Sequence, residues 1–324
     1  MRITTDPDEA ARALAAGHLA AVPTETVYGL GARADLPRAI ARVYAAKGRP
    51  ADHPLIVHIR DAAELGAWAR HTPAYAHALA TQAWPGPLTL VLPRTERAGD
   101  FVTGGQDTVA IRVPSHPLMR TVLDRLAAFT GDPAIGVAAP SANRFGKVSP
   151  TTAGHVEVEL GLVLDEDDVI LDGGPSEVGV ESTIVDCTGE QPVILRPGHL
   201  SADDVAAITG LAVGTHSQVR APGTLASHYA PTARVVIVDA DALAAMTSAD
   251  TRVGVLALAD IPTPDGAVRL SAPKDVNDFA RVLYAALREA DALELETVLA
   301  VPPPHIGVGA AVDDRLRRAA HDGG

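Results

Sequence analysis

Short apolar runs and helical spacings alternate through the first two thirds of the chain, separated by Pro and Gly. Residues 6–17 predict a helix, because Asp6 can cap it, Pro7 suits its first position and Gly17 can end it. Further helices are predicted over 35–46 and 202–209, and strands over 19–22, 55–59, 88–92, 108–113, 135–139 and 193–195. This mixture through residue 210 indicates an α/β fold.

A second region of strands and helices follows a segment, 211–232, that is rich in Gly, Pro, Ser and His. Strands are predicted there over 234–238 and 252–258, and helices over 276–290 and 313–320. The alternation favours a small, mostly parallel sheet. Because 324 residues exceed one average domain, we expect a first domain over 1–210, a linker over 211–232 and a second domain over 233–324.

Composition and charge narrow the function classes. Hydrophobic residues make up 47% of the chain but aromatic residues only 3%, so the cores must be built from Ala, Val, Leu and Ile. The formal net charge of -13 argues against tight, sequence-independent binding to nucleic acid. Any function that needs positive charge must therefore use a local group of basic residues. The single Cys187 excludes an internal disulfide. With no signal-peptide layout and no long apolar run, we expect a cytoplasmic protein without a membrane partner.

Two glycine motifs match phosphate-binding loops only superficially. Residues 29–34 fit the loose dinucleotide fingerprint, but a new helix begins only after the motif, so we interpret them as a tight glycine turn. Residues 174–179 have the spacing of a phosphate loop, but Val180 stands where Lys is required. Neither motif therefore predicts a nucleotide site.

Two pairs of polar residues are better candidates for ligand binding. Lys47 and Arg49 lie at a predicted helix end; stabilisation of the helix dipole would explain one cation but less easily both. Ser141 and Asn143 follow a predicted strand, at the carboxyl end where open α/β sheets usually bind ligands. Alone, each pair also fits an ordinary structural role.

Taken together and in order, the motifs resemble those of the threonylcarbamoyl-AMP synthase family in its long form, over nearly the whole chain. The matching segments are 23–30 (PTETVYGL), 47–50 (KGRP), 54–58 (PLIVH), 84–89 (WPGPLT), 108–114 (TVAIRVP), 139–143 (APSAN), 181–183 (EST), 196–198 (RPG), 222–223 (PG), 228–231 (HYAP) and 314–320 (DRLRRAA). The resemblance implies a YrdC-type twisted mixed sheet flanked by helices and a smaller, Rossmann-like, mostly parallel C-terminal domain.

The resemblance also implies the reaction. The family joins L-threonine, bicarbonate and ATP into threonylcarbamoyl-AMP and releases pyrophosphate. A separate tRNA threonylcarbamoyl transferase complex then modifies the adenosine beside the anticodon, and would be the downstream partner. No carboxylate cluster has an obvious metal-binding spacing, so we expect Mg²⁺ to come with ATP and to be held mainly by phosphates and water.

Residue roles follow from the same resemblance. Lys47 and Arg49 would be catalytic. The residues implied in ATP binding are Lys47, Arg49, His53, Thr108, Ser141, Asn143, Ser149, Arg196 and Tyr229. Those implied in threonine binding are Thr26, His58, Arg112, Ala139 and Ser182. Fixed cations suit a reaction between two anions, and Arg112 suits a carboxylate. His53 stands where the family usually carries Asn, and His58 also fits a core histidine with satisfied hydrogen bonds.

The segment 211–232 invites a hypothesis of its own. Defined turns, rather than a flexible Gly/Ser tether, are encoded by Pro222-Gly223 and by the residues around Tyr229. We therefore expect this segment to form a lid over the opening of the active site. The alternative is that Tyr229 only anchors the second domain. Three other function classes compete with a synthase: a carbamoyltransferase sharing the YrdC-type domain, a module that binds double-stranded RNA, and an interaction protein without activity.

Overall fold

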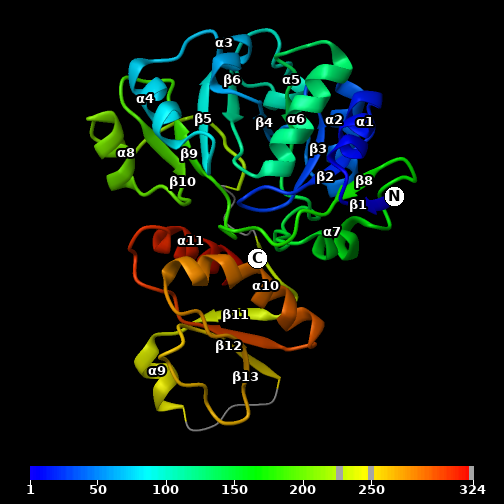
Figure 1. The fold of residues 1–324 in the computed structure, drawn as a ribbon. Helices are drawn as coiled ribbons and strands as arrows, with labels where there is room; N and C mark the ends of the chain where they lie inside the picture. The colour runs from blue at the N-terminus through cyan, green and yellow to red at the C-terminus, as the bar shows by residue number, and fades with distance from the viewer. Residues whose placement is uncertain (224–228, 247–251, 321–324) are drawn as a thin grey trace. The chain divides into compact units, whose positions relative to one another are not determined.

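The chain folds into two compact units (Figure 1). The computed structural model describes residues 1–223, 229–246 and 252–320. As far as they are described, residues 1–145, 150–176 and 181–224 form the first unit. Residues 146–149, 177–180 and 225–324 form the second, so two short segments flanked by residues of the first unit pack with the C-terminal part of the chain.

The first unit is built on a mixed sheet, as expected. Its ten strands run in the order β1-β8-β2-β3-β7-β4-β6-β5-β9-β10. The pair β4 and β6 is parallel, whereas β5 and β6 are antiparallel. The strands are β1 (Arg2–Thr4), β2 (Ala20–Val22), β3 (Gly29–Arg33), β4 (Ile56–His58), β5 (Leu88–Pro93), β6 (Thr108–Arg112), β7 (Val137–Ala138), β8 (Val169–Leu171), β9 (Thr183–Asp186) and β10 (Val193–Arg196).

Helices flank this sheet, and their ends follow local chemistry. They are α1 (Pro7–Ala16), α2 (Pro37–Lys47), the 3-10 helix η1 (Ala62–Glu64), α3 (Leu65–Trp68), α4 (Ala74–Ala83), α5 (Asp100–Thr103), α6 (Pro117–Thr130), α7 (Ala153–Leu160) and α8 (Ala202–Thr209). The predicted start and end of α1 are confirmed: the Asp6 carboxylate accepts the amide of Asp8, and Gly17 takes φ 89°. Helix α2 stops at Gly48 (φ 61°), which leaves Lys47 on its last turn.

Alternate residues of the strands face opposite sides of the sheet. On one side, Ala20, Val22 and Val137 pack with residues of α1 and α6, and we call this side the α1 face. Farther along the same face, over β4, β6, β5 and β9, the buried apolar cluster of Ile56, Val91, Ala110 and Ile184 packs instead with Ala221 and with Leu195 and Val219. His58, Thr108 and Arg112, three of the candidate polar residues, lie on this part of the α1 face.

The interpretation of residues 29–34 as a tight glycine turn is wrong. Residues Gly29–Arg33 form strand β3, which pairs antiparallel with β2 and β7. A Cβ atom at Gly31 would lie 2.9 Å from both the Ala20 carbonyl oxygen and Val137 Cγ1. The glycines therefore permit close approach of neighbouring strands rather than a turn.

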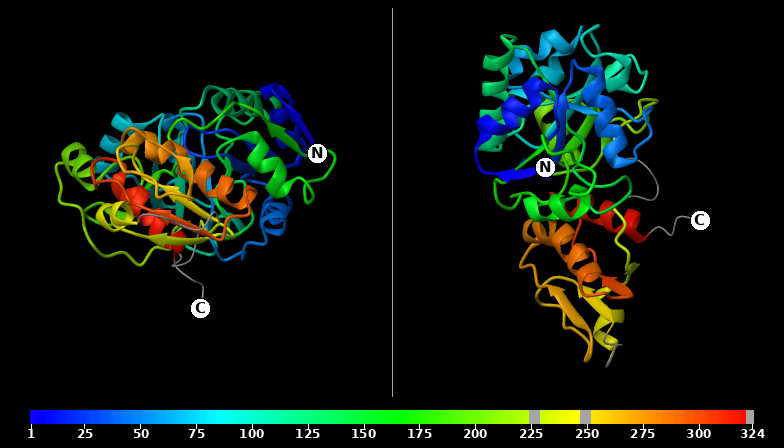
Figure 2. Two further views of the ribbon diagram at one scale, coloured as in Figure 1. Left: turned by 90° about the horizontal axis from the view of Figure 1, so that it is seen from below. Right: turned by 90° about the vertical axis from the view of Figure 1, so that its right-hand side faces the viewer.

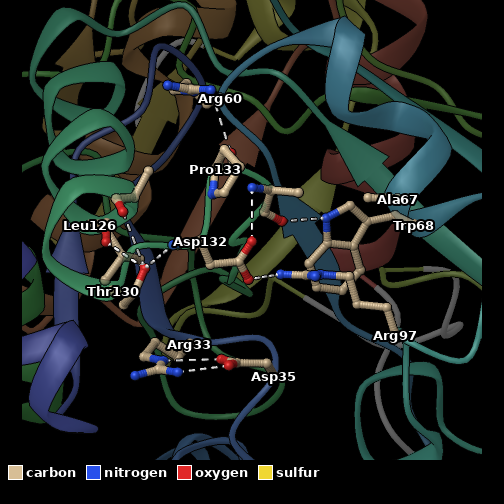
Figure 3. A network of polar contacts seen from close by, with 12 residues as sticks. Arg33, Asp35, Arg60, Ala67, Trp68, Arg97, Leu126, Thr130, Asp132 and Pro133 are labelled. Atoms are coloured by element: carbon tan, nitrogen blue, oxygen red, sulfur yellow. Dashed lines mark hydrogen bonds and ion pairs between the residues drawn. The ribbon is translucent and has the colours of Figure 1, made fainter.

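A polar network fixes the loop that leads into β7 (Figure 3). Trp68 Nε1 donates to the Ala134 carbonyl (3.0 Å), and the Arg97 guanidinium lies 5.1 Å above the Trp68 ring. Asp132 pairs with Arg97 and accepts the Ala134 amide (3.0 Å). These contacts hold the start of β7, whose far end delivers residues 139–143.

The second unit contains a four-stranded parallel sheet, which confirms the predicted small parallel domain. Its strands β11 (Arg234–Ile237), β12 (Val253–Leu256), β13 (Val268–Ser271) and β14 (Thr297–Ala300) run in the order β11-β14-β12-β13. Helix α9 (Ala240–Ala245) packs on one face through Leu243, while α10 (Val276–Ala292) and α11 (Gly309–Ala320) cover the other (Figure 2). Among the described residues, no helix is both long and apolar enough to span a bilayer.

Candidate active site

The loop after β7 wraps around the last turn of α2. Lys47 Nζ donates to the main-chain carbonyl of Ser141 (2.5 Å) and to that of Asn143, and the amide of Phe145 donates back to the Lys47 carbonyl (2.8 Å). The Lys47 side chain is buried. Burial, and then the charge of Arg49, hold the pKa of Lys47 well below its ordinary value. Lys47, Ser141 and Asn143, three of the implied ATP contacts, thus lie together.

Arg49 and His53 complete this cluster. Arg49 is 8% exposed; it donates to the Pro54 carbonyl (3.1 Å), and its guanidinium lies 5.8 Å from the centre of the Phe145 ring. The His53 ring meets the same Phe145 ring edge-on at 5.3 Å. Burial and the Arg49 charge lower the pKa of His53. We call Lys47, Arg49, His53, Ser141 and Asn143 the lysine cluster.

A second cluster forms around Arg112 at the end of β6. Its guanidinium donates to Thr26 Oγ1 (2.9 Å) and to the Gly86 carbonyl (3.3 Å), and it forms an ion pair with Glu25 Oε1 (2.7 Å). Arg112, Thr26 and Glu25 are all buried. We call these residues, with His58, the arginine cluster.

Sequence reasoning missed Glu25. Burial, the largest influence, raises the pKa of this carboxyl, but the charge and hydrogen bond of Arg112 and main-chain donors including the Ser115 amide outweigh it, so the net pKa is lowered. Glu25 is therefore ionised beside Arg112. The available signal was one acid within the otherwise neutral turn 23–28, opposite a buried arginine that needs a counter-charge.

His58 lies beside Arg112 because β4 and β6 pair in register at these two residues. Burial, and then the charge of Arg112, lower the pKa of His58 to about 3, so its ring is neutral at physiological pH. The amide of Ala139 donates to the Ile56 carbonyl on the same strand (3.0 Å). Residues 139–143 thus run from the arginine cluster to the lysine cluster.

Ser182, which directly precedes β9, contacts Arg196 at the end of β10. Arg196 donates to the carbonyl (3.0 Å) and the hydroxyl (3.1 Å) of Ser182, and also to the Pro222 carbonyl (3.3 Å). The Thr89 hydroxyl lies 2.8 Å from that of Ser182. Arg196 therefore ties a predicted threonine-binding residue to the segment at Pro222.

Thr108 lies on the same face as Arg112 but at the opposite end of β6, about 13 Å away at the usual rise of a strand. Beside it, the segment before Pro222 is anchored to the first unit. The Arg220 amide donates to Gln106 (2.8 Å), and the Ser217 hydroxyl donates to Asp186 (2.6 Å). The rest of the predicted linker motif, 224–228, lies outside the described residues.

The two remaining predicted ATP contacts, Ser149 and Tyr229, belong to the second unit. Both are buried. The Tyr229 ring stacks on Tyr284 with centroids 5.6 Å apart, and the Arg315 guanidinium lies 5.1 Å from its centre. Tyr229 has a positive φ of 65°, which is unusual for a residue with a side chain.

Known proteins match both parts of the chain. Residues 12–198 match a family described as "Telomere recombination", and residues 194–321 match one described as "Threonylcarbamoyl-AMP synthase, C-terminal domain". A threonylcarbamoyl-AMP synthase of Pyrococcus abyssi is 39% identical over 94% of this chain and 91% of its own length. The chain belongs to the threonylcarbamoyl-AMP synthase family.

Other relatives agree with this membership. The synthase of Bacillus subtilis is 38% identical over 98% of this chain and 94% of its own. The solved structure of Pyrococcus abyssi Sua5 complexed with L-threonine is 37% identical, with a TM-score of 0.83, and the match covers 99% of this chain and 96% of that one. The chain is thus a nucleotidyltransferase-type enzyme, and the synthase interpretation is favoured over the carbamoyltransferase and RNA-binding alternatives.

Proposed function

We propose that this enzyme makes L-threonylcarbamoyl-AMP from L-threonine, bicarbonate and ATP and releases pyrophosphate. The product would pass to a tRNA threonylcarbamoyl transferase complex. The observation that carries the proposal is that residues 139–143 join two clusters of buried polar residues, one around Lys47 and one around Arg112. The lysine cluster presents cations bonded to carbonyls, and the arginine cluster presents a cation paired with a carboxylate.

The arginine cluster suits an amino acid. Free threonine carries a carboxylate and an ammonium group, and Arg112 with Glu25 offers one charge of each sign. In this proposal Arg112 takes the carboxylate, while Thr26 and Ser182 supply hydroxyl partners. His58, being neutral, can donate or accept a hydrogen bond without adding charge. Ala139 would line the site through its main chain.

The lysine cluster suits a triphosphate. Main-chain carbonyl groups accept from Lys47 and from Arg49, so both basic side chains are held at the end of α2, where phosphate oxygens could bind. Ser141 and Asn143 follow a strand end, and Arg196 and Thr108 would also contact the nucleotide. Ser149 and Tyr229, the other implied ATP contacts, belong to the second unit. His53 would contact the nucleotide where relatives use Asn.

Magnesium fits this site as a companion of the nucleotide. In the described part of the chain, no three His, Cys, Asp or Glu side chains gather so that they could hold a metal ion. Phosphate oxygens and water would therefore supply most of its ligands. The ion would neutralise phosphate charge, and this chain's residues would orient the nucleotide.

The proposed reaction joins two anions. The ammonium group of threonine first loses a proton to the solvent. The free amine then attacks the carbon of bicarbonate, and water leaves to give a carbamate. A carbamate oxygen then attacks the α-phosphorus, and the bond from that phosphorus to the bridging oxygen of pyrophosphate breaks. Lys47, Arg49 and Arg196 would offset the repulsion between the reactants and stabilise charge on the phosphates.

The described linker residues support a shielding role. Val219 and Ala221 pack on the α1 face beside Ile56 and Ala110. Ala110 precedes Arg112 by two residues on β6, so both face the same side of the sheet. A segment held there could keep water from a carbamate and an adenylate, both of which hydrolyse readily. We therefore propose that the 211–223 part of the predicted lid covers the reactants.

The decisive experiment measures pyrophosphate release by the full chain with ATP and threonine, with and without bicarbonate, and detects the adenylate by mass. Bicarbonate-dependent release with a threonylcarbamoyl-AMP mass is expected. Valine is the matched control substrate, because it replaces the hydroxyl by a methyl group and leaves buried polar groups unpaired. Equal release with valine, or release without any adenylate, would contradict the proposal.

A further inference from the structure

Two short segments pack with the second unit, although residues of the first unit flank them in the chain. They are residues 146–149 and 177–180. The first begins three residues after Asn143, and the second ends two residues before Ser182. Each segment is therefore close in the chain to a residue that contacts a substrate in the proposed function.

The segment 146–149 is held by the main chain around Ala230 and by helix α10. Lys147 forms a parallel bridge with Ala230, and the Ala230 amide donates to the Gly146 carbonyl (3.1 Å). From α10, the guanidinium of Arg288 donates to the Val148 carbonyl. Val148 and Ser149 are both buried. A charged donor on a main-chain carbonyl fixes the path of the loop directly.

The segment 177–180 lies against the same helix at Ala280 and Arg281, eight and seven residues before Arg288. Gly179 has φ 80°, and a Cβ atom there would lie 2.4 Å from both the Ala280 carbonyl oxygen and the Arg281 Cα. These are main-chain atoms of a helix, so they cannot move aside cheaply. Only glycine fits this contact, and Val180, which follows, is fully buried.

We propose that α10 is a positioning element for both substrates. Arg288 sets the ATP-side segment 146–149, and the helix backbone at Ala280 and Arg281 sets the threonine-side segment 177–180. This inference rests on the proposed function and assigns the C-terminal domain a task within that reaction. The helix touches neither substrate in this proposal; it fixes the two loops from which Ser149 and Ser182 emerge.

Two variants test the two contacts of α10 separately. Arg288→Ala should raise KM for ATP, and Gly179→Ala should raise KM for threonine, each by about tenfold or more, since a displacement of roughly 1 Å can cost about a hundredfold. In each variant the KM for the other substrate should stay within about twofold. Arg288→Lys, which keeps a donor, should restore part of the ATP affinity.

Matched controls test for general damage. Gly307→Ala introduces a side chain at another positive φ (54°) of the second unit, where no atom lies within 4 Å of the new Cβ. Arg252→Ala removes an exposed arginine that pairs with Glu296. Both should leave each KM within about twofold, as exposed substitutions usually do.

The outcomes are distinguishable. If the wild-type chain makes no adenylate, the proposed function fails before the variants are compared. If it does, equal rises of both KM values in a folded variant, or no change in either, would overturn the positioning role of α10. Should Gly179→Ala fail to fold, Arg288→Ala decides alone: a KM for ATP equal to that of wild type would refute the inference.

Discussion

The lysine cluster and the arginine cluster both bury cations, but they stabilise them differently. Lys47 donates to two main-chain carbonyls and Arg49 to a third, whereas Arg112 has the carboxylate of Glu25 at 2.7 Å. Carbonyl dipoles orient a cation and leave its charge in place, while a carboxylate cancels it. One region therefore holds its basic side chains through main-chain oxygens, whereas the other contains a compensated ion pair, which suits a zwitterionic ligand.

The largest expected effect comes from breaking the balanced pair. Glu25→Ala should lower the free energy of unfolding of the first unit by about 3–5 kcal/mol, because Arg112 would remain buried and uncompensated. Both tryptophans, Trp68 and Trp84, are buried in this unit, so urea unfolding followed by their fluorescence reports on it selectively. Asp35→Ala is the control.

Asp35 pairs with Arg33 at 2.7 Å, but both side chains are partly exposed, at 32% and 21%. Its removal should therefore lower the unfolding free energy by at most about 1 kcal/mol. If Glu25→Ala were no more damaging than Asp35→Ala, the buried pair would not be the main support of Arg112.

The next effect concerns the lysine cluster. Arg49→Ala should weaken ATP binding by about 1.5–3 kcal/mol and lower adenylate formation severely, while the fold and threonine binding are retained. Calorimetry with each ligand separately measures this. Arg38→Ala, an exposed arginine on the same helix α2, is the control. Unchanged turnover in a folded Arg49→Ala protein would remove Arg49 from the site.

A pH effect sharpens the description of the arginine cluster. The pKa of His58 falls from 6.5 to about 3 on folding, through burial and the nearby Arg112 charge. As the pH drops below about 6.5, His58 therefore takes up a proton in the unfolded chain but not in the folded chain. Its contribution to the free energy of unfolding is complete above that pH and is lost towards about pH 3. The slope is up to about 1.4 kcal/mol per pH unit.

His58→Asn should flatten this slope between about pH 4 and 6, measured by the same tryptophan fluorescence at several pH values. Glu25 acts in the same direction, because its lowered pKa also makes stability fall with acid. Some slope should therefore persist in the variant. His77→Asn, an exposed position on α4, controls for the substitution itself. A slope identical to that of wild type would show that His58 titrates normally.

The smallest effect is that of salt. Raising the ionic strength from about 0.05 to 0.5 M should weaken ATP binding a few-fold and leave threonine binding nearly unchanged, because screening acts on net charge and less on a compensated pair. Titrations of both ligands across the salt series measure this. Equal salt dependence for the two ligands would erase the contrast between the clusters.

Local chemistry made several elements predictable. Helix α8 begins and ends where expected, because Ser201 and Asp204 form a capping box and Gly210 takes the left-handed conformation. The helix predicted over 35–46 is α2, which runs one residue further, to Lys47, and ends where Gly48 takes the left-handed conformation. Strand β3 was missed because glycine signals a turn in isolation. Its strand conformation depends on the neighbours β2 and β7, which the local pattern does not contain.

The amino-acid sequence by itself determined several helix ends, the alternation of strands and helices and the family resemblance, which in turn implied the mixed and parallel sheets and the set of residues around Lys47. Only the tertiary structure decided that Glu25 neutralises Arg112, that His58 stands beside it in register, and that α10 meets residues 146–149 and 177–180. The reason is physical. Caps and apolar periods act over a few residues, whereas strand register and ion pairing join residues far apart in the chain, so only the packed fold defines them.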